Sequence, residues 1–494
     1  SSPQPGAVVH HRAIICLPRV GMLCCRRADY QHRVLVEGLS DAPVDNGSDK
    51  QADKVGEERA DKGSAQSTCC SPVVCYLSIC SVAVLGALAA TGGAAVLGWS
   101  LTRLSAGQDP HTTPDEFPRS GWCGGCPNGN KSDAVLRECL KPCVNLRFVL
   151  DWEAQAKELG FKLVNFPSRV GPRGESPVNI SAWWLPPEPR EGQPQRASLR
   201  IVLLHGYGSN NNHCGVQSMC FLLRSLGFGC LAPSVRDHGL SGISDHPGVM
   251  TWGYDYQADL LGAWDYAVGD PHGVLGGALN HSQVGLVGFS KGGLEAAVAF
   301  GFEHRVPGVW LESAPFSGFT GTLTEQLSAK VPVLGRALAP LVVPMALFWA
   351  RVFTGRRVQI FDPFEILATC SGPQRHVALA HSWFDTMVSP LEAERAAAFF
   401  GGFWECYKPF LFTPPASCNG DTHHVSVWQF PDDTREALCA FWTRVFGLPK
   451  SFCQLETQRK YQLWQPNGAM PPALQYGRES GTLRQSTFKQ SPAA

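Results

Sequence analysis

Short apolar runs alternate with longer segments of helical pattern between about Asp151 and Leu448. The runs consist of β-branched and other apolar residues and end at turn residues, which is typical of buried strands. In chain order they are FKLVNFPS, VNISAWWLPP, LRIVLLHG, GFGCLAPSV, QVGLVGFS, GVWLESAP, RHVALAHSWFD and KPFLFTPPA. Segments between them, such as YQADLLGAWDYAVG, repeat apolar residues at the spacing of a helix face. The pattern predicts an α/β domain with a mostly parallel sheet, helices on both faces and an antiparallel start.

Outside residues 151–448 the chain divides into four stretches. Residues 1–72 become polar and charged, a composition that predicts a disordered tail. Residues 73–101 carry no charged side chain and are long enough to cross a bilayer as a transmembrane helix, with a buried core helix as the alternative. Residues 102–150 form a Cys-rich linker. Residues 449–494 are polar and rich in Gln, and they predict a flexible tail.

The charges bear on partners and on membrane orientation. Lys plus Arg and Asp plus Glu both number 42, so no nucleic-acid partner is expected. More basic residues precede the predicted span than follow it directly. Those before it include Arg26, Arg27, Lys54, Arg59 and Lys62, and the nearest after it are Arg103 and Arg119. This bias predicts a single-pass protein with a cytosolic tail and a lumenal or extracellular main domain.

The cysteines favour the same orientation. Twelve of the 19 follow the predicted span, and four of these form a compact CxxC plus CxxxC cluster: Cys123, Cys126, Cys139 and Cys143. Two disulfides would suit an oxidising compartment, whereas a structural zinc site is the alternative that the spacing admits. N-x-Ser/Thr sequons begin at Asn130, Asn179 and Asn280, a pattern that fits a lumenal domain.

A candidate nucleophile lies in the Gly288-Phe289-Ser290-Lys291-Gly292 stretch. Ser290 follows a predicted strand and precedes a predicted helix, which is the context that a nucleophile elbow requires. A serine that only caps the following helix is the alternative. Because a serine hydroxyl needs a base and a group that orients the base, an acid and a histidine should follow at later strand ends.

Both groups follow in the required order. Asp385 lies in a turn at the end of the seventh run, and His423 and His424 lie between the eighth run and the final predicted helix. Upstream, the HGYG turn follows the third run. Backbone N–H groups of Tyr207 and Lys291 would form an oxyanion hole beside Ser290.

The chain resembles the α/β-hydrolase superfamily, close to its serine aminopeptidase-like and lysophospholipase-like branch, over roughly residues 161–447. HGYGSN resembles the oxyanion turn of the family, VRDHGLSG its loop after the fourth strand, GFSKGG the elbow and DTMVSP the acid turn. The acid turn departs from the usual Asp-x-x-Val-Pro by the insertion of Ser389. Family spacing to a following proline favours His424 over His423, and Lys291 stands where the family often has Met.

These features predict a membrane-anchored serine hydrolase in which Ser290, His424 and Asp385 form the catalytic triad. An ester or thioester with a lipid-like acyl group is the favoured substrate, and no cofactor is expected. A serine aminopeptidase-like peptidase and a non-catalytic binding module of the same fold are the alternatives.

A long insertion between the sixth and seventh runs, residues 317–365, resembles in position the lid of the superfamily. Its stretch from Ala337 to Ala350 has no charge, and Pro340 and Pro344 are expected to interrupt it. We therefore expect an apolar cap rather than a second bilayer span. A helix pair packed on the domain core is the alternative.

Overall fold

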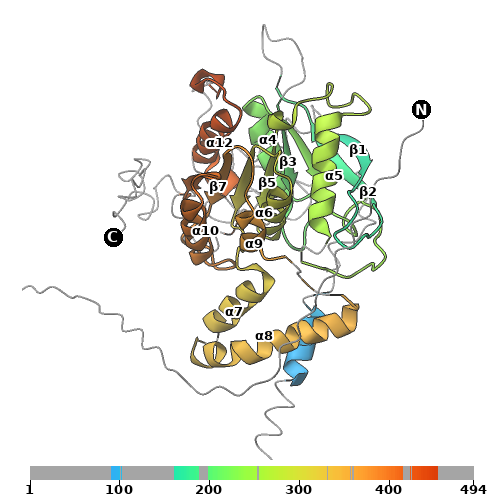
Figure 1. Cartoon of the computed structure of the whole chain (residues 1–494), viewed down its shortest axis with the longest axis vertical. Helices are drawn as coiled ribbons and strands as arrows, with labels where there is room; N and C mark the ends of the chain where they lie inside the picture. The colour runs from blue at the N-terminus through green and yellow to red at the C-terminus, as the bar shows by residue number, and fades with distance from the viewer. Residues whose placement is uncertain are drawn as a thin grey trace, which may run out of the picture. The chain divides into compact units, whose positions relative to one another are not determined.

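The computed structural model describes residues 91–100, 102, 161–188, 199–252, 255–330, 332–356, 358, 361–414, 423 and 426–453. Within these ranges an eight-stranded sheet has the order β1-β2-β4-β3-β5-β6-β7-β8 (Figure 1). Its strands are β1 (Lys162–Pro167), β2 (Asn179–Leu185), β3 (Arg200–Leu204), β4 (Gly229–Pro233), β5 (Val284–Phe289), β6 (Gly308–Glu312), β7 (Arg375–Ala380) and β8 (Tyr407–Phe412). The first seven predicted runs each contain one of these strands, and the eighth overlaps β8, which begins one residue earlier.

The sheet is mixed, with parallel pairing over most of its width. β2 pairs antiparallel with both β1 and β4, which confirms the predicted antiparallel start. The six strands from β4 to β8 in the sheet order run parallel to one another. The carboxyl ends of these six strands therefore share one edge of the sheet, and residues that follow different strands meet there.

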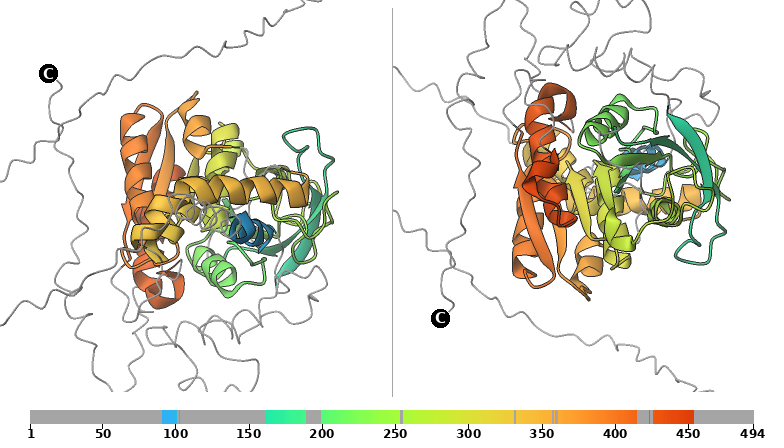
Figure 2. Two further views of the ribbon diagram at one scale, coloured as in Figure 1. Left: turned by 90° about the horizontal axis from the view of Figure 1, so that it is seen from below. Right: turned by 90° about the horizontal axis from the view of Figure 1, so that it is seen from above.

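Helices cover both faces of the sheet (Figure 2). The helices are α4 (Cys214–Ser225), α5 (Tyr256–Gly269), α6 (Lys291–Phe302), α9 (Pro363–Ala368), α10 (Leu391–Gly402), α11 (Ser426–Gln429) and α12 (Pro431–Val445), with short 3₁₀ turns at His281–Gln283 and Lys450–Cys453. Alternate residues of β3 belong to different cores: Val202 and Leu204 pack with α5 and α6, whereas Ile201 and Leu203 pack with α4 and α12. This period of two explains why the central strands are apolar throughout.

The insertion between β6 and β7 forms two further helices, α7 (Gly318–Lys330) and α8 (Pro332–Thr354). The predicted interruption is wrong, because α8 continues through both Pro340 and Pro344. A proline inside a helix costs about 3 kcal/mol through its lost hydrogen bond and its ring contacts. Packing offsets this cost: Ala339, Val343 and Ala350 lie in a small apolar cluster with Phe319 and Leu323 of α7.

Among the described residues, one helix is long and apolar enough to cross a membrane by length and composition alone, Gly335–Thr354 within α8. Of the predicted span, only residues 91–100 are described, and they are helical. Together with residue 102 they form what we call the N-terminal helix. The predicted tail 1–72, most of the linker 102–150 with its four-cysteine cluster, and residues 454–494 lie outside the described residues.

Two disulfides join pairs of described cysteines, and neither pairing was predicted. Cys220 in α4 is bonded to Cys230 in β4, and Cys370 before β7 is bonded to Cys406 before β8. Both bonds join a strand or its immediate start to a neighbouring segment. Disulfides of this kind persist in oxidising compartments.

Two leucines test whether the central strands are buried on both faces of the sheet while the edge strand is not. Leu286 in β5 is fully buried, whereas 42 % of Leu163 in the edge strand β1 is exposed. Leu286→Ala should lower the free energy of unfolding by about 2–5 kcal/mol, because it removes buried methyl groups and leaves a cavity. Leu163→Ala should change it by no more than about 0.5 kcal/mol. Urea denaturation of both variants measures the difference, and equal losses would contradict the described core.

Candidate active site

Ser290 stands in a strained turn between β5 and α6. Its backbone has φ 52° and ψ −121°, a conformation that a residue with a side chain rarely adopts. Such a backbone costs about 1–3 kcal/mol and persists only where its surroundings hold it. The N–H of Ser290 donates to the Glu312 carbonyl of β6 at 2.8 Å, which anchors the turn to the neighbouring strand.

Two glycines make this turn sterically feasible. A Cβ on Gly288 would lie 2.3 Å from the Gly292 carbonyl oxygen, and a Cβ on Gly292 would lie 2.2 Å from the His205 carbonyl oxygen. Both distances are far below any tolerated contact. The glycines that flank Ser290 are therefore required by the close approach of β3, β5 and α6.

Ser290, His423 and Asp385 form one hydrogen-bonded chain. Ser290 Oγ lies 2.8 Å from His423 Nε2, and His423 Nδ1 lies 2.8 Å from Asp385 Oδ2. All three residues are buried. Because a carboxylate only accepts, Nδ1 carries the proton and donates to Asp385, which leaves Nε2 of the neutral ring as the acceptor of the serine hydroxyl.

The histidine of this arrangement is His423, and not the predicted His424. The predicted choice rested on family spacing to a following proline, but His423 is the residue that lies between Ser290 and Asp385. His424 itself lies outside the described residues. Adjacent residues of a chain generally point in different directions, so a shift of one position decides which ring reaches the serine.

Asp385 is held in its ionised form. Burial alone would raise the pKa of this carboxyl, but hydrogen bonds from His381 and His423 outweigh burial and hold its pKa well below the usual range. Backbone N–H groups of Met387 and Val388 donate to Oδ1, each at 2.9 Å. His381 Nε2, 3.4 Å from Oδ2, was not singled out in the sequence, since a histidine that follows a strand has no distinctive pattern.

The turn after β3 lies against the serine. A Cβ on Gly206 would lie 3.3 Å from Ser290 Cβ, so the Gly206–Tyr207 peptide is beside the hydroxyl group. His205 fixes that peptide: its Nε2 accepts from Val235 N–H at 3.4 Å, and its Nδ1 donates to the Gly206 carbonyl at 2.9 Å. Burial and then the nearby His238 and Lys291 lower the pKa of His205 well below its usual value, so the ring stays neutral.

The orientation of the Gly206 carbonyl also sets the direction of the Tyr207 N–H, because both belong to one planar peptide group. His205 therefore positions one of the two predicted oxyanion donors. The other predicted donor, the Lys291 N–H, belongs to the first residue of α6 and has no acceptor within that helix. The sequence identified both backbone groups but not the part played by the His205 side chain.

The Lys291 side chain is directed into the protein and not toward a substrate. It is 1 % exposed, its Nζ lies 2.6 Å from Glu295 Oε1, and it stands over the Tyr256 ring at 4.1 Å. Burial raises the pKa of Glu295 to about 7, although the charge of Lys291 acts to lower it. The unusual cation next to the nucleophile thus forms a buried ion pair under the elbow.

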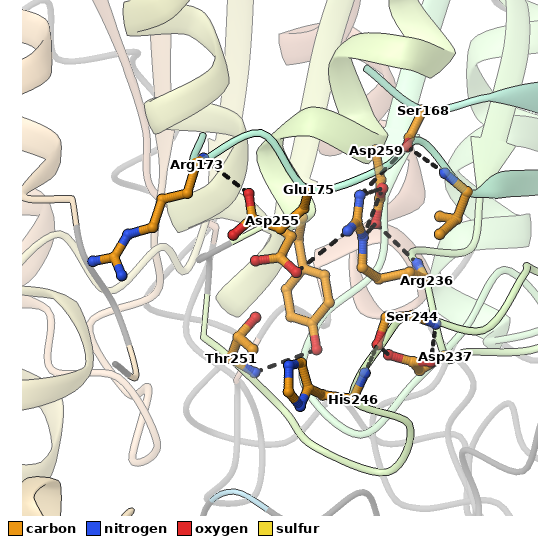
Figure 3. A network of polar contacts seen from close by, with 12 residues as sticks. Ser168, Arg173, Glu175, Arg236, Asp237, Ser244, His246, Thr251, Asp255 and Asp259 are labelled. Carbon is orange, nitrogen blue, oxygen red and sulfur yellow. Dashed lines mark hydrogen bonds and ion pairs between the residues drawn. The ribbon is translucent and has the colours of Figure 1, made fainter. Parts of the chain in front are cut away.

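A second buried charge cluster holds the loop after β4 (Figure 3). Arg236 donates to Asp259 through its backbone N–H at 2.9 Å and through Nη2 at 2.7 Å, and its Nη1 lies 3.3 Å from Asp255. Asp255 also binds Arg356, just beyond α8, at 2.9 Å. Burial raises the pKa of Asp255 to about 6, partly offset by Arg236 and Arg356. This cluster ties the end of α8 to the domain.

No protein-family model and no curated protein matches this chain. Solved structures similar to it include an esterase of Pyrococcus furiosus, 19 % identical, with a TM-score of 0.41 and coverage of 58 % of this chain and 93 % of that one. A puromycin-hydrolysing peptidase of Mycobacterium tuberculosis is 17 % identical, with a TM-score of 0.41 and coverage of 58 % and 40 %. An acylaminoacyl peptidase is 14 % identical, with a TM-score of 0.37 and coverage of 64 % and 44 %.

These three structures are an esterase and two peptidases. The fold of this chain is described by its own features: a mixed, mostly parallel sheet, an antiparallel β2 and a strained serine between β5 and α6, where a nucleophile elbow requires one.

The two adjacent histidines provide a matched pair of variants. His423→Ala should slow the reaction of Ser290 with a fluorophosphonate and with activated esters by about 10⁴-fold or more, because the serine loses its proton acceptor. His424→Ala should keep most of the rate. Stopped-flow labelling of both variants measures this, and the reverse ranking would contradict the geometry.

The buried ion pair predicts a pH-dependent loss of stability. Lys291→Met leaves the Glu295 carboxylate buried without its counter-charge, and should lower the free energy of unfolding at pH 8 by about 3–5 kcal/mol. A buried acid with a raised pKa costs stability as the pH rises, so the loss should shrink toward pH 5, where Glu295 is protonated.

The control is Lys291→Met/Glu295→Gln, which removes both charges and should recover most of the stability at pH 8. Denaturation at both pH values measures the effect. A loss of equal size at pH 5 and pH 8 would mean that lost packing of the lysine side chain, and not the unpaired carboxylate, is responsible.

Proposed function

We propose that this chain is a membrane-anchored serine hydrolase that cleaves esters or thioesters through an acyl-enzyme. The hydrogen-bonded chain from Asp385 through His423 to Ser290 is the observation that carries the proposal. It provides a nucleophile, a base within reach of its proton, and a buried anion that orients the base. These contacts require the His423 tautomer with the proton on Nδ1, and the first chemical step needs the same tautomer, because Nε2 must be free to accept the proton of Ser290.

In the first half-reaction, Ser290 Oγ attacks the carbonyl carbon of the substrate while His423 Nε2 takes the hydroxyl proton. The resulting oxyanion accepts hydrogen bonds from the Tyr207 and Lys291 N–H groups. As the tetrahedral intermediate collapses, the bond to the leaving alcohol or thiol breaks and His423 returns the proton to that group. Water then attacks the acyl-serine, with His423 again as base, and releases the acid and free Ser290.

The lid favours an acyl substrate over a peptide. α7 and α8 enclose an apolar cluster that includes Phe319, Leu323 and Val343, and α8, from Pro332 to Thr354, has no acidic residue. The one carboxylate of α7, Glu325, is ion-paired with Arg395 at 2.8 Å. A peptidase that binds a free amino terminus would be expected to offer a carboxylate near the site. A serine aminopeptidase-like peptidase remains the second candidate because the triad serves amides equally well.

The proposed location is a membrane, with a single N-terminal span and the hydrolase domain on its lumenal or extracellular side. The charge-free stretch before Arg103 and the basic residues ahead of it support the span and its orientation. The disulfides Cys220–Cys230 and Cys370–Cys406 support an oxidising environment for the domain.

A fluorophosphonate probe tests the proposed chemistry. The full chain in detergent should be labelled at one serine, and Ser290→Ala should abolish the labelling. Ser313→Ala is the matched control, because Ser313 is also buried, also has a positive φ of 51°, and follows the adjacent strand β6. It should leave labelling intact.

If a folded Ser290→Ala variant is still labelled, or if the parent protein is not labelled at all, the hydrolase proposal fails and a binding module becomes the better description. Competition against the probe by acyl esters, acyl thioesters and aminoacyl amides would then rank the substrate classes. Stronger protection by the amides would favour the peptidase candidate.

A further inference from the structure

One face of α8 is apolar and exposed along its whole length. Val333, Leu341, Phe348 and Val352 are exposed and follow a spacing that places them on one side of the helix, with 58 % of both Leu341 and Phe348 accessible. The opposite side carries residues that are buried against α7 and the N-terminal helix: Ala339, Val343, Ala346 and Ala350. An apolar stripe of this length on a surface helix indicates a contact with something outside the domain.

The N-terminal helix packs directly on α8. A Cβ on Gly98 would lie 2.5 Å from the Ala346 carbonyl oxygen, so the two backbones approach closely. Trp99 meets Phe353 edge-on, with ring centroids 5.3 Å apart, and Thr102 O accepts from Met250 N–H at 2.8 Å. Figure 2 shows this helix beside α8. Val96 and Trp99 add further exposed apolar area next to that of α8.

The sequence connects this pair of helices to the membrane. The N-terminal helix is the end of the stretch between Lys62 and Arg103 that has no charged side chain, which is the proposed span. Its contact with α8 therefore holds α8 at the point where the chain passes from the bilayer to the domain. A helix held there lies within reach of the lipid surface.

The connections of α8 distinguish a helix along the surface from a second span. A single residue separates its first residue, Pro332, from the end of α7. α7 is held to the domain by Gln326, whose side chain donates to the Met387 carbonyl in the acid turn. Its other end is tied to the domain by Arg356, which binds Asp255 at 2.9 Å. Both ends are therefore fixed to the same domain, whereas a span would place them on opposite sides of a bilayer.

The charges of α8 suit lipid headgroups. The helix has no acidic residue, and its two arginines, Arg336 and Arg351, are exposed near its two ends. An apolar stripe with cationic side chains beside it and aromatic residues around it is typical of a helix that lies in a membrane interface. If the stripe bound a partner protein in place of lipid, there would be no reason for arginines beside it or for its position next to the proposed span.

We infer that α8 lies in the membrane interface of the leaflet next to the anchor, with Leu341, Phe348 and Val352 in contact with lipid acyl chains. The lid insertion that follows β6 then faces the bilayer, and the site receives its acyl substrates from the membrane and not from water. The docking of α8 rests on the proposed membrane anchor, and the second statement rests in addition on the proposed hydrolase chemistry.

Photocrosslinking tests the docking without reference to activity. The full chain, with benzoylphenylalanine in place of Leu341 or Phe348, is reconstituted into vesicles of phosphatidylcholine and phosphatidylserine. Both positions should form adducts with phospholipid, detected by mass spectrometry, at least tenfold above the same probe at Trp404. Trp404 is the matched control, because it is 66 % exposed but precedes β8, at the opposite edge of the sheet from the lid.

Absence of lipid adducts at both positions, or equal adducts at Trp404, would overturn the docking. Adducts with a second copy of the chain, or with another protein, would overturn it as well, and would identify the stripe as a protein interface.

Activity tests the delivery of substrate. Leu341→Glu/Phe348→Glu should lower hydrolysis of a long-chain ester embedded in vesicles by about tenfold and leave a water-soluble butyryl ester unaffected, because both side chains point outward. Trp404→Glu should change neither rate. Equal losses on both esters would overturn delivery from the membrane. If the parent protein hydrolyses neither ester, the proposed hydrolase function fails, while the crosslinking result still decides the docking.

Discussion

The strained backbone of Ser290 is the constraint on which the site depends. A positive φ at a serine persists only because β3, β5 and α6 meet without side chains between them, at Gly288 and Gly292. The same close approach brings the peptide of Gly206 beside Ser290. The turn therefore fixes the hydroxyl and one oxyanion donor together, and the parallel sheet supplies the common edge at which the acid and the histidine reach them.

Buried charges surround this turn more closely than the chemistry alone requires. Lys291 and Glu295 form an ion pair within α6, and Arg236 with Asp259 forms another on the loop after β4. Such pairs contribute little net stability, but removal of one partner is costly because the other is left buried. Their effect is therefore to raise the free energy of any conformation in which the elbow or the β4 loop moves and a buried charge loses its partner. The hydrogen bonds of Asp385 act in the same way, because they hold one conformation of the acid turn.

Most of the sheet can be predicted from the apolar runs in the sequence, because strands that are buried on both faces consist almost entirely of apolar residues. The serine and the acid follow as well, since each occupies a turn directly after such a run. The position of the histidine does not follow, because neither periodicity nor turn chemistry distinguishes His423 from its neighbour His424. The disulfides between Cys220 and Cys230 and between Cys370 and Cys406 join positions whose proximity only the folded sheet creates.

The continuous helix through Pro340 and Pro344 illustrates a different limit. Local propensity predicts a break, and tertiary packing against α7 and the N-terminal helix overrides it. Lys291, which stands where the resembled family often has Met, is a second case in which the folded chain decides the role of a side chain. The folded chain provides Glu295 one helical turn away and the face of Tyr256 above it.

An aromatic stack joins the oxyanion turn to the lid. The Tyr207 ring stacks on Trp252 with centroids 4.9 Å apart, and Trp252 contacts Phe319 of α7 with centroids 4.6 Å apart. Trp252 has a φ of 49°, an unfavourable value for so large a side chain, so packing on both sides must hold it. Because Phe319 belongs to the apolar cluster that also contains Val343 of α8, the packing of the lid and the conformation beside Tyr207 share the same contacts. The lid is thus part of the structure that supports the site. A contact that shifts α8 from outside would be transmitted through Phe319 and Trp252 to the Tyr207 side of the oxyanion turn.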